Sequence, residues 1–138
     1  MEKQETIKRI NQSIQNTMTS TIGIEITDIG DDFICAKMPV DHRTIQPFGL
    51  LHGGASVCLA ETLGSIGGGI KVYSNNELVV GVEINANHLK SARDGWGYGK
   101  AIPICIGKKI QVWDIRISNK SDELVCVSRL TLAVIPKK

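Results

Sequence analysis

One acidic residue, Glu61, lies inside a long segment of apolar and small residues. The segment runs from Gly53 to Gly69 and carries no other charged side chain. A segment that is apolar on every side is typical of a buried helix, where an isolated carboxylate is costly unless it is paired, hydrogen-bonded or protonated. We therefore interpret Glu61 as a general base or nucleophile. The alternative is a glutamate at the edge of its helix face that reaches water.

A second candidate site lies at the start of the same segment, where His52 precedes Gly53 and Gly54. The first backbone N–H groups of a helix are free and lie at the positive end of its dipole, so they can stabilise a carbonyl oxygen that becomes anionic. The two glycines allow a ligand to approach the backbone closely. The alternative for His52 is a structural hydrogen bond at the helix start.

Helix geometry separates these two candidates within one chain. His52 and Glu61 are nine residues apart, which places them on opposite sides of a helix and about 13 Å apart along its axis. Ser65, four residues after Glu61, shares its face. If both ends of the helix serve one active site, two copies of the helix must lie antiparallel across a dimer axis.

Several other motifs carry weaker indications. Lys90, Arg93, Lys108 and Lys109 could contact phosphate groups, with Gly107 leaving backbone N–H groups free beside the last two, or they could be solvated turn residues. The segment 95–100 is glycine-rich but lacks the ending of a phosphate-binding loop. The three histidines and four cysteines have no metal-ligand spacing, so we expect no metal and no cofactor.

The composition indicates a single folded domain. The 138 residues are 42% hydrophobic and 22% charged, with a net charge of +2 and only 4% aromatic residues, which argues against nucleic-acid binding. No apolar run is long enough to span a membrane and no signal peptide is visible. We expect a cytoplasmic protein whose cysteines are reduced and mostly buried.

The hydrophobic periodicity predicts an α+β fold. Apolar residues at helical spacing over 3–18 predict an N-terminal helix within residues 1–20, and the glycines at 67–69 are expected to end the central helix of 53–69. Alternating residues predict a hairpin around residues 30–32, followed by strands at 78–86, 96–104, 109–117 and 123–134. Short turns between strands imply one antiparallel sheet wrapped around the long apolar central helix. A second subunit would cover the rest of that helix.

Two stretches of sequence carry a family resemblance. The stretch from Gln46 to Ser56, followed by Ala60–Ser65, resembles the hotdog-fold acyl-CoA thioesterases of the phenylacetate-degradation type. The stretch from Val80 to His88, with Ser91–Arg93 after it, looks most like the bacterial 1,4-dihydroxy-2-naphthoyl-CoA hydrolases and their relative that clears misloaded aryl carrier proteins. The resemblance implies one hotdog domain over residues 1–138 and a homodimer that forms a homotetramer.

The resemblance also implies roles for individual residues. Glu61 matches the catalytic carboxylate, and Ser65 matches a hydroxyl that positions the attacking water. Gln46, His52 and Gly53 match the residues around the thioester and would come from the other subunit. The residues that match the contacts with the coenzyme A arm are Gly81, His88, Leu89, Lys90, Ser91, Cys105, Ile106, Gly107, Lys108, Lys109 and Ile110.

These observations predict hydrolysis of an aromatic acyl-CoA to a free acid and coenzyme A. A thioester has a good leaving group, so a polarised carbonyl and one carboxylate suffice. One alternative is an acyl-CoA-binding protein of the same fold without hydrolysis, and another is the clearance of misloaded aryl carrier proteins. A hotdog hydratase is disfavoured, because its usual Asp/His pairing has no counterpart between Gln46 and Ser65.

Overall fold

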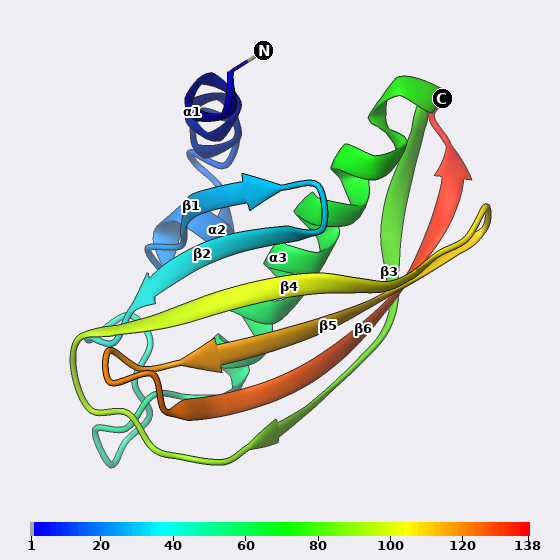
Figure 1. Ribbon diagram of the computed structural model, residues 1–138. Helices are drawn as coiled ribbons and strands as arrows, with labels where there is room; N and C mark the ends of the chain where they lie inside the picture. The colour runs from blue at the N-terminus through cyan, green and yellow to red at the C-terminus, as the bar shows by residue number, and fades with distance from the viewer. Residues whose placement is uncertain (1) are drawn as a thin grey trace.

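A six-stranded antiparallel sheet curves around one long helix (Figure 1). The computed structural model describes residues 2–138. The strands lie in the order β1-β2-β4-β5-β6-β3, and every neighbouring pair is antiparallel. The predicted α+β architecture is thereby confirmed. In chain order the elements are α1 (Lys3–Ser13), α2 (Met18–Thr21), β1 (Glu25–Gly30), β2 (Phe33–Pro39), α3 (Gly53–Val72), the short helix η1 (Tyr73–Asn75), β3 (Glu77–His88), β4 (Trp96–Ile106), β5 (Ile110–Ser118) and β6 (Leu124–Pro136).

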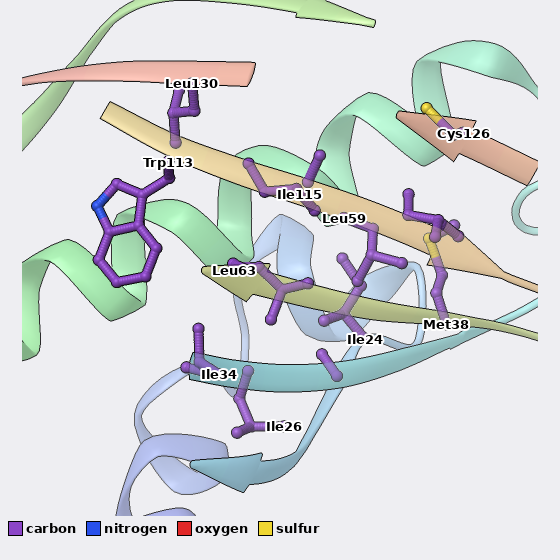
Figure 2. Close-up of a cluster of buried hydrophobic side chains, with 14 of the residues drawn as sticks. Ile24, Ile26, Ile34, Met38, Leu59, Leu63, Trp113, Ile115, Cys126 and Leu130 are labelled. Atoms are coloured by element: carbon purple, nitrogen blue, oxygen red, sulfur yellow. The ribbon is translucent and has the colours of Figure 1, made fainter. Parts of the chain in front are cut away.

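The core lies between α3 and the concave face of the sheet (Figure 2). Alternate residues of β5 face the helix, and Trp113, Ile115 and Ile117 are almost completely buried. Leu59 and Leu63 of α3 pack against them with no exposed surface. Each fully buried large side chain of this kind contributes about 1.5–3 kcal/mol. This packing fixes α3, and with it the candidate catalytic residues, against the sheet.

The central helix is longer than the sequence predicts. It continues through Gly67–Gly69 to Val72, so the expectation that these glycines end it is wrong. The glycines serve close packing instead, because a Cβ on Gly67 would lie 2.8 Å from Trp113 Cη2 and one on Gly68 would lie 2.5 Å from Gln111 Oε1. The buried Gln111 accepts a hydrogen bond from Trp113 Nε1 (2.9 Å) and donates one to the Gly68 carbonyl (3.3 Å), which ties the helix to β5.

Neighbouring glycines of α3 should respond oppositely to alanine. Gly68→Ala should lower the free energy of unfolding by about 1–3 kcal/mol, because the new methyl group overpacks the contact with Gln111 and Leu132. Gly69→Ala should raise it by up to about 1 kcal/mol, because no atom lies within 4 Å of that Cβ position and alanine favours the helix. Urea denaturation at one protein concentration measures the unfolding free energy of both variants. Equal changes in that free energy would contradict the packing described here.

The N-terminal helix is shorter than the sequence predicts. Instead of one helix within residues 1–20, the chain forms α1 and α2, separated at Asn16, whose left-handed backbone (φ 63°) interrupts the first helix. Asn11 of α1 donates to the Ile26 carbonyl (2.9 Å) and accepts from the Ile26 N–H (2.8 Å). Its side chain thus pairs with the backbone of the edge strand β1, which covers part of that edge.

The opposite edge of the sheet is formed by β3, which pairs only with β6 among the described residues. Val80 and Val82 of β3 are 43% and 61% exposed. This edge therefore presents apolar side chains and backbone groups to the outside. Within residues 2–138, no helix has both the length and the hydropathy that crossing a membrane requires.

Candidate active site

The loop before α3 is fixed by backbone hydrogen bonds. The His52 N–H donates to the Thr44 carbonyl (2.8 Å), and the Leu51 N–H donates to the Ala92 carbonyl (2.7 Å). The Gln46 side-chain oxygen accepts hydrogen bonds from the N–H groups of Phe48 (2.6 Å) and Leu50 (3.4 Å). The Gln46 amide oxygen thus stabilises its own turn, and its NH2 group is the part that can donate to a ligand.

The first turn of α3 has one backbone N–H without an acceptor among the described residues. His52 is the N-cap, and its Nδ1 accepts a hydrogen bond from the Gly54 N–H (2.7 Å). The N–H groups of Ala55 and Ser56 donate to the His52 carbonyl at 3.0 and 3.2 Å. Gly53 is left as the N–H that can polarise a carbonyl oxygen at this helix end. This is the donor that the family resemblance implies.

The cap separates two roles of His52 that can be tested. Because Nδ1 accepts, the hydrogen of the neutral ring lies on Nε2, which can donate to a substrate. His52→Asn keeps a side chain that caps well, so its unfolding free energy should stay within about 0.5 kcal/mol of wild type, whereas His52→Ala should lose about 1 kcal/mol. We expect kcat/KM of both variants to fall about 10²-fold, as for a lost carbonyl-binding donor. If His52→Asn kept wild-type turnover, His52 would not donate to the substrate, and capping of α3 would be its only role.

A cavity of about 350 Å³ opens beside this helix start. It brings together six of the predicted site residues, namely Gln46 and Gly53 of the thioester group and His88, Leu89, Lys90 and Ser91 of the coenzyme A strip. The remaining lining residues are Leu50, Leu51, Ser56 and Val125. Ser56, which is not among the site residues predicted from the sequence, is buried and lies one helical turn after Gly53. Its i+3 spacing from Gly53 is the signal that could have found it.

Glu61 lies at the open edge of the sheet. Its carboxylate faces Gly81 of β3, and a Cβ on Gly81 would lie 2.6 Å from Oε2. Gly81, predicted as a coenzyme A contact, is thus the neighbour of the carboxylate in this chain. Glu61 and Ser65 are both half-buried, so the burial expected for a carboxylate in an apolar helix is only partial in the single chain. The reason is that no strand covers β3 on this side among the described residues.

The surroundings of the nearby Cys58 disfavour the thiolate form that a nucleophile needs. Burial raises the pKa of its thiol above the ordinary value, and the negative charge of Glu61 raises it further. Burial likewise raises the pKa of Cys35 and Cys126. Of the four cysteines, only Cys126 is fully buried and Cys105 is exposed, so the expectation of mostly buried thiols is wrong.

The structure does not bring the two halves of the predicted site together within one chain. Glu61 lies eight positions after Gly53 in the continuous helix α3, which is about 12 Å along the axis. Neither Glu61 nor Ser65 lines the cavity at Gly53. The strip 105–110 is also remote, since Ile106, Gly107 and Lys108 line a different cavity of about 340 Å³ beside Lys71 and Val72 at the C-terminal end of α3.

Two details of the basic residues differ from the sequence prediction. The Gly107 N–H is not free, because it donates to the Ile110 carbonyl (2.9 Å) and closes the turn between β4 and β5. Lys90 forms an exposed ion pair with Glu123 (Nζ–Oε2 2.8 Å), and this contact lowers the pKa of the Glu123 carboxyl. Lys90 must leave this pair to bind a phosphate, and exposed pairs of this kind are weak.

Comparison with known proteins identifies the family. The sequence profile of the Thioesterase superfamily matches residues 48–126, and the chain belongs to this family. It is a thioester hydrolase of the hotdog fold.

The chain is similar to proteins of known name over nearly its whole length. It is 47% identical to the 1,4-dihydroxy-2-naphthoyl-CoA hydrolase of Escherichia coli over 94% of this chain and 95% of that protein. It is 44% identical to the proofreading thioesterase EntH of Cronobacter turicensis, over 94% of each protein. A crystal structure of a thioesterase from Haemophilus influenzae superimposes with a TM-score of 0.92 at 52% identity, covering 94% of this chain and 90% of that chain.

Proposed function

We propose that this chain hydrolyses an aromatic acyl-CoA thioester in active sites shared between two subunits. The observation that carries the proposal is the separation along α3: the Gly53 N–H and its cavity lie at one end, and Glu61 lies at the open β3 edge. A second subunit placed against β3 would bring its own Glu61 toward this cavity. The name of the Escherichia coli relative supports an aromatic acyl group on coenzyme A.

In the proposed reaction the Gly53 N–H, the Gln46 NH2 group and His52 Nε2 hold the thioester at its carbonyl. Ser65 and Glu61 of the other subunit position a water molecule, and Glu61 accepts its proton as the oxygen attacks the carbonyl carbon. The carbonyl oxygen becomes anionic and is stabilised by the N–H donors. When the carbonyl re-forms, the C–S bond breaks, and the coenzyme A thiolate leaves with the proton that Glu61 had accepted from water, which returns Glu61 to its carboxylate form. The products are the free aromatic acid and coenzyme A.

The coenzyme A arm would follow a strip that starts at residues 88–91 beside the cavity and continues to residues 105–110. These two segments line separate cavities of one chain, so the strip, like the catalytic group, would be completed across the subunit interface. Lys90, Lys108 and Lys109 are the exposed cations that could meet phosphate groups along it.

Removing these three cations should affect substrate binding more than catalysis. Replacing Lys90, Lys108 and Lys109 together with Ala should raise KM for benzoyl-CoA at least about 10-fold, the sum of three exposed ion pairs, with kcat mostly intact. A short N-acetylcysteamine thioester lacks phosphates and should be unaffected. Three exposed lysines elsewhere, Lys8, Lys120 and Lys138, provide a control of equal charge. If KM changed equally for both substrates, we would conclude that Lys90, Lys108 and Lys109 are solvated turn residues that do not contact phosphate groups.

The substrate class is tested by thiol release from a panel of aryl-CoA and alkyl-CoA thioesters, with an aryl thioester of a carrier-protein arm included. We expect the highest kcat/KM for aryl-CoA. Higher kcat/KM for the carrier-protein arm would instead support the proofreading role named for the Cronobacter relative. Tight binding of all substrates without turnover would favour an acyl-CoA-binding protein.

A further inference from the structure

The ring of His88 packs against Gly53 at the start of α3, on the side where a side chain of residue 53 would lie. His88 ends β3, where it pairs with Cys126, and the next residue donates its N–H to the Val125 carbonyl (2.8 Å). The atoms nearest to the Cβ position of Gly53 are His88 Nε2 at 2.8 Å, Cε1 at 3.1 Å and Cδ2 at 3.3 Å. The ring therefore points its Nε2 corner at Gly53. Any residue other than glycine at position 53 would displace the ring.

The surroundings of His88 leave this nitrogen available for a ligand. Its side chain takes part in no hydrogen bond or ion pair recorded within residues 2–138, and it lines the same cavity as Gly53. A neutral histidine carries its hydrogen on one ring nitrogen and can donate from Nε2. His88 Nε2 and the Gly53 N–H thus lie close together on one cavity. Hydrogen-bond donors around a thioester carbonyl oxygen stabilise the negative charge that develops on it.

We propose that His88 is a catalytic residue that donates a hydrogen bond from Nε2 to the thioester carbonyl oxygen, in addition to the donors already named at this helix start. This assignment rests on the proposed function and differs from a contact with the coenzyme A arm. No proton is transferred in this step; His88 stabilises the negative charge that forms on the oxygen. Gly53 then has two functions, since its N–H binds the oxygen and its missing side chain leaves room for the imidazole.

Two thioesters that share an acyl group separate this role from binding of the coenzyme A arm. Benzoyl-CoA and S-benzoyl-N-acetylcysteamine have the same carbonyl, but only the first carries the nucleotide. His88→Ala should lower kcat/KM about 10²-fold for both, since both lose the same donor. His88→Gln, which retains an N–H donor, should recover part of the loss. A change confined to KM for benzoyl-CoA, or no change at all, would overturn the proposal.

The carbonyl can also be observed directly. In a Glu61→Gln background, bound benzoyl-CoA labelled with 13C at the carbonyl should show a lowered C=O stretching frequency in isotope-edited infrared spectra, and adding His88→Ala should reverse part of that shift. An unchanged frequency would overturn the role of His88. The proposed function is tested separately from the role of His88, because it depends only on whether the wild-type protein hydrolyses benzoyl-CoA. His88 is exposed, so thermal unfolding of its variants should match wild type.

Discussion

Glu61→Gln should lower the rate of thioester hydrolysis by at least about 10²-fold, the scale of a lost general base. The amide keeps the size of the carboxylate next to Gly81 but cannot accept a proton from water. The variant should therefore remain folded and still bind substrate. Stopped-flow or steady-state thiol release with benzoyl-CoA measures the loss, and binding of the unhydrolysed substrate to the variant shows that the site is intact.

An exposed glutamate far from the site provides the matched control. Glu25 lies on β1, at the edge of the sheet opposite β3. Glu25→Gln makes the same change of charge and should leave kcat and KM near wild type. If Glu61→Gln also retained wild-type turnover, Glu61 would be only a glutamate at the edge of its helix face, the alternative that the sequence leaves open.

Much of the fold could be predicted from the sequence, because periodicity reflects burial directly. Buried residues alternate along β5 and along the first part of β4, and α3 is apolar on nearly all sides. The end of α3 could not be predicted from its glycines. Glycine both ends helices and allows close packing, and only the contact of Gly68 with Gln111 shows which applies. The sequence pattern also does not show the break at Asn16, because Ile14 and Met18 on either side of it keep the helical spacing.

The sequence allowed the types of residue in the candidate site to be predicted better than their arrangement in space. The carboxylate in α3 and the glycines at its start stand out from their neighbours in sequence, and helix geometry alone gives their separation. The position of His88 against Gly53 depends on how β3 crosses α3, which no local pattern encodes. The same applies to Gly81, whose contact with Glu61 joins residues of two different elements. The way in which α3 packs against β3 thus determines which side chains of the site lie next to one another.

An active site shared between two subunits predicts that two inactive variants recover activity when they are mixed. A site contained in one chain predicts no such recovery. His52→Asn and Glu61→Gln are each expected to be nearly inactive while folded, and they remove different halves of the site. When the two variants are unfolded and refolded together, one site of each mixed dimer collects both defects and the other collects none. Refolding each variant alone gives only defective sites.

Activity after mixed refolding, measured with the dimers counted by native mass spectrometry, therefore tests the shared site most directly. Random pairing makes about half of the dimers mixed, each with one intact site of two, so hydrolysis should return to roughly a quarter of wild type. If every chain instead holds a complete site, each chain keeps its own defect. Mixed dimers present at the expected fraction with no recovered activity would contradict the shared active site.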